Sequence, residues 1–170
     1  NYHLTTKKDQ IEKMGLYEKQ EKKLIELKDS KTEYNALRKD LSHYLLRNLS
    51  ENIDVEYPQK IFEIGKVFEN KNEIIEKTNL SLAISPGNFT EAKQILEYIF
   101  KMLNLKIECK EPNTISSHFI EGRCAEIKLD NQPIGFLGEV HPKILDNWKI
   151  RMPVAMFEID IERIFERLIG

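Results

Sequence analysis

The chain has 170 residues, of which 41% are hydrophobic and 32% are charged, a mixture typical of a folded domain rather than of a disordered chain. Its 26 basic and 28 acidic residues give a net charge of −2, which argues against a domain that mainly grips nucleic-acid phosphates, because such domains are clearly basic. No run of about 18 apolar residues occurs, so the sequence predicts no transmembrane helix and no membrane partner. Because the first residue is Asn1 rather than Met, we expect residues 1–170 to be a single domain cut from a longer protein.

The N-terminal third predicts two short strands, a charged arm and a long helix. Strands are expected at residues 2–6 and 24–27, on either side of residues 7–23, whose many Lys and Glu side chains predict a solvated helix or hairpin arm. Ser30 and Glu33 have the spacing of a capping box, and a helix is expected after them. Its apolar stripe recurs at three and four residues and consists of Tyr34, Leu37, Leu41, Tyr44, Leu45 and Leu49.

Two strands and a second helix are predicted in the middle of the chain. Residues 60–68 alternate, with Ile61 and Val67 on one face and Phe62 on the other, which is typical of a strand. Residues 80–84 predict a second strand. Asn88 is placed to cap a helix, whose inner face would hold Ala92, Ile95, Leu96, Ile99 and Leu103.

The second half predicts mainly sheet. Pro142 suits the first turn of a short helix, and Asp160 is placed to cap a last helix. Strands are expected at residues 105–109, 123–129, 134–140 and 154–159. The inner faces of the two helices would hold Ile144, Leu145 and Trp148 in the first and Ile161, Ile164, Phe165 and Leu168 in the second. The whole pattern predicts an α+β fold, a mostly antiparallel sheet flanked by helices.

Side chains that could carry chemistry are scattered along the chain. There is no Walker loop, GxGxxG or GxSxG motif. Cys109 and Cys124 form no CxxC pair and have no histidine at ligand spacing, so no metal site is predicted. Cys124 with His118 or His141 is one alternative, a nucleophile with its base, although a small side chain packed in a strand explains Cys124 more simply.

Four stretches, taken in order, resemble one known family. They read EYNALR at residues 33–38 with Leu41, YPQKIFEIG at residues 57–65, EGRCA at residues 121–125 and IGFLGEVHP at residues 134–142. In this order and spacing they resemble the C-terminal core module of the beta subunit of phenylalanyl-tRNA synthetase, in its archaeal and eukaryotic form. The resemblance covers nearly the whole chain, and it is weakest in the arm.

The resemblance implies a class II aminoacyl-tRNA synthetase-like fold. The holoenzyme is a cytoplasmic α2β2 tetramer that uses ATP and Mg²⁺ to attach phenylalanine to its tRNA, and the alpha subunit carries the catalytic site. The beta core is a catalytic-like module that serves assembly. The resemblance therefore implies no catalytic residue, cofactor or metal in this chain, the alpha subunit as its partner, and tRNA contact through the holoenzyme.

The residues can be compared with the ATP site of active class II synthetases. That site uses one arginine on a strand and a second that follows a glycine-rich strand, because guanidinium forks suit polyphosphates. Arg123 and Arg163 stand as degenerate counterparts, but no glycine precedes Arg163 in the last strand. Glu158, Asp160 and Glu162 would add negative charge beside a triphosphate. We therefore expect this module not to bind ATP.

In class II enzymes a long helix followed by a strand forms the subunit interface. The resemblance thus implies that residues 33–50 and 60–68 dock against the alpha subunit or another core module. A lone fragment would then expose apolar surface from Tyr44, Leu46, Ile61 or Phe68. The alternative is that these segments close the domain's own core. The implied interface residues are Arg38, Leu41, Tyr44, Ile61, Glu63, Gly65 and Phe68.

Three other functions stay open on the sequence alone. One is a free-standing synthetase-like paralogue that senses an amino acid. The second is an unrelated thiol hydrolase that uses Cys124. The third is direct binding of tRNA by basic residues in the arm, although acidic residues are interleaved with them. These basic residues are Lys7, Lys8, Lys19, Lys22 and Lys23.

Overall fold

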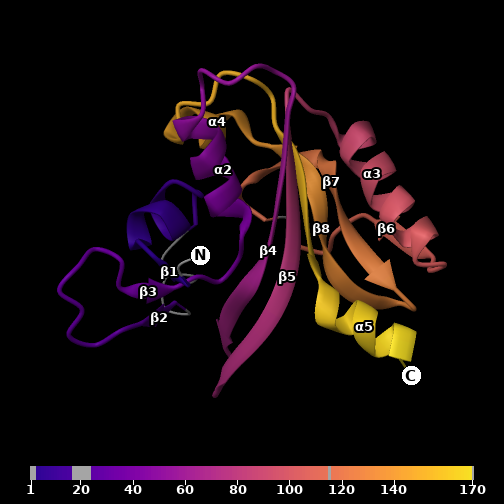
Figure 1. The fold of residues 1–170 in the computed structure, drawn as a ribbon, viewed down its shortest axis with the longest axis horizontal. Coiled ribbons are helices and arrows are strands. Elements are labelled where there is room, and N and C mark those ends of the chain that lie inside the picture. The colour runs from indigo at the N-terminus through magenta and orange to yellow at the C-terminus, as the bar shows by residue number, and fades with distance from the viewer. Residues whose placement is uncertain (1–2, 17–23, 115, 170) are drawn as a thin grey trace.

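The computed structural model describes residues 3–16, 24–114 and 116–169, and its centre is a six-stranded sheet (Figure 1). All neighbouring strands in this sheet are antiparallel, in the order β4-β5-β9-β8-β7-β6. The strands are β4 (Gln59–Asn70), β5 (Ile74–Ser85), β6 (Ile107–Lys110), β7 (Phe119–Leu129), β8 (Gln132–Val140) and β9 (Ala155–Asp160). The predicted α+β fold with an antiparallel sheet is confirmed. The observed strands β4, β5, β7 and β8 are longer than the predicted ones.

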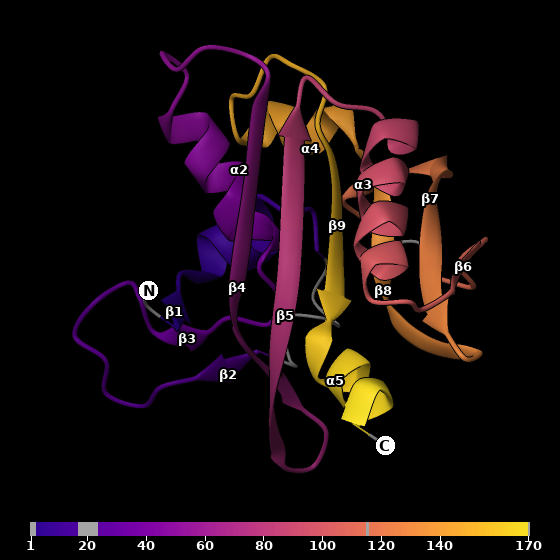
Figure 2. The same cartoon turned by 45° about the vertical axis from the view of Figure 1, so that its right-hand side comes forward.

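Helices cover both faces of this sheet. α3 (Phe89–Met102) and α5 (Ile161–Ile169) lie on one face, with α3 in front of β8 and β9 in Figure 2. α2 (Ser42–Glu51) and α4 (Pro142–Asn147) pack on the other face. Strand alternation separates the two cores: Ala83 and Met156 enter the core under α2 and α4, whereas Ile84 and Phe157 enter the core under α3 and α5.

Local capping signals set the starts of three helices as predicted. The Asn88 side chain accepts a hydrogen bond from Glu91 N at 2.9 Å at the start of α3. Asp160 Oδ1 accepts one from Glu162 N at 3.1 Å at the start of α5. Pro142 occupies the first turn of α4. The inner face of α5 was only partly predicted, because Ile164 is buried whereas Phe165 and Leu168 are 55% and 44% exposed.

The predicted helix over residues 33–50 is wrong in its first half. α2 begins at Ser42, and residues before it form β3 (Ala36–Leu37). β3 is the middle strand of a small antiparallel sheet with β1 (Leu4–Thr5) and β2 (Ile25–Glu26). Pairing with two strands satisfies the backbone of residues 36–37 without helical bonds. The Ser30 hydroxyl accepts from Thr32 N instead of capping a helix.

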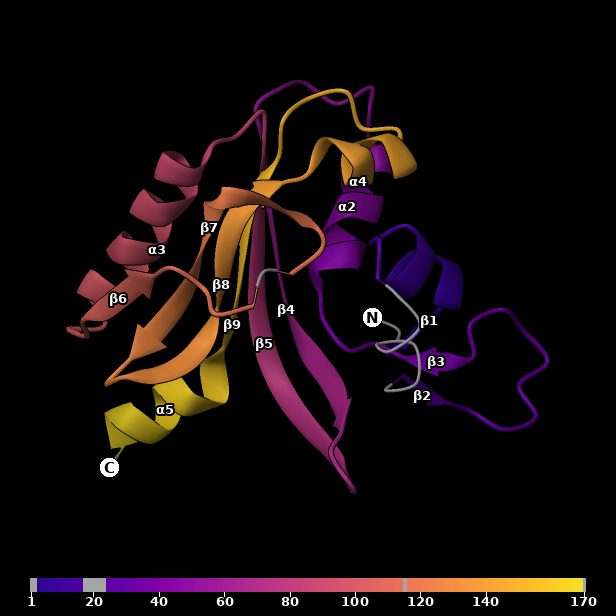
Figure 3. The same cartoon turned by 180° about the vertical axis from the view of Figure 1, so that it is seen from behind.

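The arm at residues 7–23 was predicted to be solvated, which is wrong for its described part. Residues 8–12 form a π-helix (η1, Lys8–Glu12), and Asp9, Gln10 and Ile11 are buried. Burial is tolerated because the polar side chains find partners: Asp9 pairs with Lys13 at 2.8 Å, and Gln10 donates to Asp40 at 2.8 Å. Figure 3 shows this segment beside α2. Residues 17–23 lie outside the described residues.

Candidate functional site

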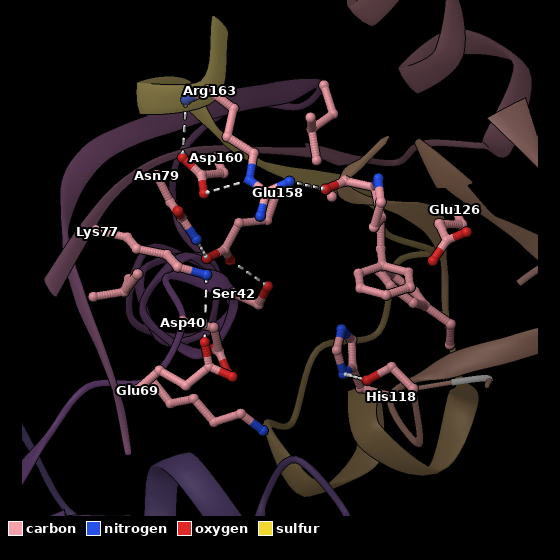
Figure 4. A pocket seen from close by; sticks show the side chains of 18 of the residues that line it. Asp40, Ser42, Glu69, Lys77, Asn79, His118, Glu126, Glu158, Asp160 and Arg163 are labelled. Carbon is pink, nitrogen blue, oxygen red and sulfur yellow. Dashed lines mark hydrogen bonds and ion pairs between the residues drawn. The ribbon is translucent and has the colours of Figure 1, made fainter. Parts of the chain in front are cut away.

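A pocket of about 470 Å³ opens on the α2 side of the sheet, a size within the range of small-molecule sites. Its walls come from β4, β5, β8 and β9, from the loop before α2 and from the segment before β7 (Figure 4). Its titratable lining residues are Lys39, Asp40, Glu69, Lys71, Lys77, His118, Glu126, Glu158, Asp160 and Arg163.

Glu158 of β9 points from the sheet toward the start of α2 (Figure 4). Leu41 N donates to both of its carboxylate oxygens at 3.0 Å. Ser42 Oγ donates at 2.9 Å and Asn79 Nδ2 at 2.7 Å. The carboxylate therefore joins three elements of the fold: the loop before α2, the helix itself and strand β5.

Burial and a second carboxyl group control the charge of Glu158. Burial raises the pKa of Glu158, the charge of Asp40 raises it further, and the hydrogen bonds from Asn79, Leu41 and Ser42 only partly oppose this, so the pKa is about 7. Burial also raises the pKa of Asp40, but the hydrogen bond and charge of His43 outweigh burial and bring that pKa to about 2. Asp40 is thus the ionised member of the two, and Glu158 titrates near neutrality.

His118 lies at the opposite side of the pocket from Asn79 and Arg163 in Figure 4. Its Nδ1 forms a 2.8 Å hydrogen bond with Ser116 Oγ. Burial lowers the pKa of His118 to about 4, against the attraction of Asp40. The imidazole is therefore neutral at physiological pH and supplies no positive charge to an anionic ligand.

The lining cations are mostly engaged with carboxylates. Glu69 pairs with Lys71 at 3.0 Å and with Lys77 at 3.3 Å. Arg163 Nε lies 3.7 Å from Asp160 Oδ2. These pairs leave little positive charge free to receive a polyphosphate.

The structure separates the two arginines considered for ATP. Arg163 lines the pocket, but Arg123 does not; the side chain of Arg123 is 63% exposed and pairs with Glu139 at 2.8 Å. Of the three carboxylates expected beside a triphosphate, Glu158 and Asp160 line the pocket. Glu162 does not, and it instead accepts a hydrogen bond from Thr78 at 2.7 Å.

Sequence reasoning missed the pocket's contacts across the chain. Ser42 and Asn79 are 116 and 79 residues from Glu158, so no local motif could reveal them. Gly135 was read only as part of a family motif. A Cβ at Gly135 would collide with the backbone carbonyl of Glu158, so this glycine permits the close approach of β8 to β9.

Five of the seven predicted interface residues meet in one partly buried cluster. Arg38 is 1% exposed and pairs with Glu63 at 2.7 Å. Its guanidinium lies 5.1 Å from the Tyr44 ring, and a Cβ at Gly65 would collide with it. The backbone N–H of Phe68 donates to Arg38 O at 2.9 Å. This ion-pair cluster (Arg38, Tyr44, Glu63, Gly65, Phe68) joins the start of α2 to β4.

The other two predicted interface residues also serve the core. Leu41 is fully buried, and Ile61 packs against the core under α2. Leu46, expected to be exposed, is also fully buried. The expectation of exposed apolar surface from Leu46 is therefore wrong, and Arg38 and Leu41 offer no surface to a partner.

Exposed apolar side chains lie instead on the opposite face of β4. Phe62 is 68% and Ile64 is 51% exposed. Their cross-strand partners on β5 are Leu82 and Leu80, which share the same face. We call these four residues the β4–β5 apolar face. In Figure 2, α3 lies beside β9 and does not reach β4; Leu80 and Leu82 are partly buried against the core under α3 and α5, so Phe62 and Ile64 are the exposed members of this face.

The cysteines are poorly suited to nucleophilic work. Burial raises the pKa of Cys124, and the charges of Glu121 and Glu111 raise it further. Burial likewise raises the pKa of Cys109. A thiol held protonated is a weak nucleophile, so the geometry lends the hydrolase alternative no support.

Two further findings concern the described residues only. Within residues 3–16, 24–114 and 116–169, no three His, Cys, Asp or Glu side chains are grouped to hold a metal ion. No helix in those same ranges is long and apolar enough to cross a membrane.

Comparison with known proteins gives one consistent result. The family profile "Phenylalanyl tRNA synthetase beta chain CLM domain" matches residues 1–161. A phenylalanine–tRNA ligase beta subunit from Pyrococcus furiosus is 36% identical over 171 residues, which cover 96% of this chain and 30% of that protein. One from Thermococcus onnurineus is 39% identical, over 84% of this chain and 26% of that protein. This chain thus spans less than a third of either relative.

The fold also resembles a solved structure. The crystal structure of pyrrolysyl-tRNA synthetase from Desulfitobacterium hafniense superposes with a TM-score of 0.76. The superposition covers 97% of this chain and 60% of that chain, at 17% sequence identity. At this identity the likeness concerns the fold, which is that of a class II synthetase.

Proposed function

Because the chain belongs to the phenylalanyl-tRNA synthetase beta chain CLM domain family, we propose that residues 1–170 form a non-catalytic assembly module of a phenylalanine–tRNA ligase beta subunit. The observation that supports the proposal most directly is the set of side chains that line the pocket. Its floor is occupied by the Glu158 carboxylate, and Arg163 is the one arginine of the predicted pair that lines it. The Glu158 carboxyl group takes up this space and the ionised Asp40 adds negative charge beside it, so such a pocket excludes a nucleotide rather than holding it.

The proposed partner is the ligase alpha subunit. The holoenzyme would be an α2β2 tetramer of the cytoplasm, in which the alpha subunit supplies ATP- and Mg²⁺-dependent chemistry and tRNA is bound by the assembled enzyme. The β4–β5 apolar face supports a docking role, because exposed apolar residues grouped on one face are typical of interaction sites. We therefore propose Phe62 and Ile64 as the main docking residues, and the partly exposed Tyr44, Glu63 and Phe68 stay predicted interface residues.

Sedimentation of the chain, alone and mixed with the alpha subunit, tests the partner. We expect a complex with the wild-type chain and its loss in Phe62→Asp with Ile64→Asp. Phe165→Asp is the matched control, because Phe165 is also exposed, at 55%, but lies on α5. A complex that survives the double substitution would place the interface elsewhere, and the absence of any complex would count against the assembly role.

Calorimetric titration of the chain with Mg²⁺-ATP tests the pocket. We expect no heat of binding up to millimolar nucleotide. Binding at millimolar or lower concentration would contradict a non-catalytic pocket. Titration with phenylalanine alone, in the same experiment, distinguishes an amino-acid sensor.

A further inference from the structure

Helix α2 starts without a cap of its own. The first N–H groups of any helix lack partners inside the helix. At α2 the capping position is Leu41, whose side chain forms no capping hydrogen bond, and its first turn contains no acidic residue. By contrast, α3 has Asn88 in this position, with its side chain bonded to Glu91 N. The start of α2 therefore depends on a group from elsewhere in the chain.

Glu158 supplies that group from a distance of 117 residues in the sequence. Its carboxylate accepts from Leu41 N and from the Ser42 hydroxyl. Its own strand, β9, lies between β5 and β8 in the sheet, which fixes its position. A carboxylate at a helix N-terminus is also favoured by the helix dipole.

The same carboxylate also occupies three hydrogen-bond donors at one end of the pocket, two of them on the lining residues Ser42 and Asn79. Leu41 N donates to Glu158, and the Ser42 and Asn79 side chains point to it in Figure 4. An anionic ligand that entered here would have to displace Glu158 and leave α2 uncapped. One side chain thus performs two tasks, one for the helix and one for the pocket.

We infer that Glu158 is a built-in plug, whose carboxylate holds α2 to the sheet and keeps Leu41 N, Ser42 Oγ and Asn79 Nδ2 occupied, so that these three donors are closed to a free carboxylate. This inference goes beyond the assembly role and stands whether or not the alpha subunit is the partner. It predicts that removal of the carboxylate both loosens the start of α2 and unmasks a site for a small carboxylate.

Amide hydrogen exchange on Glu158→Ala, with and without formate or acetate, tests the plug. Loss of a cap of ordinary strength predicts first-turn amides of α2 that exchange about five to ten times faster. We expect formate and acetate to slow this exchange again in a saturable manner, whereas chloride at equal ionic strength does not. Adding Ser42→Ala to Glu158→Ala should weaken the reversal, because one donor is then missing.

Glu162→Ala is the matched control. The Glu162 carboxylate accepts from the Thr78 side chain, away from the α2 start, so its removal should leave α2 exchange unchanged and insensitive to formate. Unchanged exchange in Glu158→Ala, or an equal formate effect in both variants, would overturn the inference. If Glu158→Ala does not fold, Glu158→Gln is measured instead. Faster amide exchange in the first turn of α2 supports the plug, and exchange equal to that of the wild type refutes it.

Discussion

Two half-buried groups, Glu158 and His118, make opposite contributions to the pH dependence of folding stability. Glu158 has a pKa of about 7 in the folded protein against an ordinary 4.5, so between these values the folded state binds more protons and stability falls as pH rises. His118 has a pKa of about 4 against an ordinary 6.5, so the unfolded state binds more protons and stability rises with pH. From pH 4.5 to 6.5 the two contributions oppose each other, and we expect a nearly flat profile in the wild type.

Substitution separates the two contributions. A group that is protonated in only one of the two states changes the free energy of unfolding by about 1.4 kcal/mol per pH unit, which is about 3 kcal/mol across this window. Both side chains are partly exposed, so we expect about 1–2 kcal/mol. The free energy of unfolding of Glu158→Gln should then increase by this amount as the pH rises from 4.5 to 6.5, because only the His118 contribution remains. His118→Asn should lose a similar amount over the same range.

Urea unfolding at constant ionic strength measures these slopes. Trp148 is the only tryptophan and is 2% exposed, so its fluorescence reports the loss of the core under α2 and α4, with circular dichroism as a second probe. The double substitution should be flat again, which is the internal control. A Glu158→Gln profile parallel to wild type would show that Glu158 is ionised throughout, and the reasoning would be refuted.

Two further substitutions test close contacts. Gly65→Ala should lower the free energy of unfolding by about 3 kcal/mol, because the new Cβ would displace the buried Arg38 guanidinium from Glu63. In an Arg38→Met background the same substitution should lower it by less than about 1 kcal/mol. Equal losses in the two urea titrations would rule out this contact as the cause. Asn88→Ala should lower stability by about 1 kcal/mol in thermal unfolding, and an unchanged midpoint would show that α3 does not depend on this cap.

Local chemistry made much of the fold predictable. Asn88, Asp160 and Pro142 act within three residues of themselves, so the helix starts that they define could be seen in the sequence. Alternating side chains likewise revealed most strands of the main sheet, because one face of each strand packs on a core. The family resemblance was also correct, and three of its four motifs lie mainly in β4, β7 and β8 of this sheet.

The remaining errors have a common cause, which is contact between distant segments. Leu37 fits a helical stripe, but the pairing of β3 with β1 and β2 decides its structure. Gln10 looks like a surface residue until Lys39 N and Asp40 satisfy its amide. The pocket's contacts likewise span from 79 to 117 residues.

The remote capping of α2 sets a condition for anyone who would engineer a nucleotide site into this fold. Replacing Glu158 by glycine would clear the pocket floor, yet it would also remove the group that holds the first turn of α2. A designer would first have to give that helix a local cap, for example Leu41→Ser or Leu41→Asp, although Leu41 is fully buried and its loss would open a cavity. A single substitution therefore cannot make this pocket receptive, because emptying it and keeping its wall in place are opposing demands on one carboxylate.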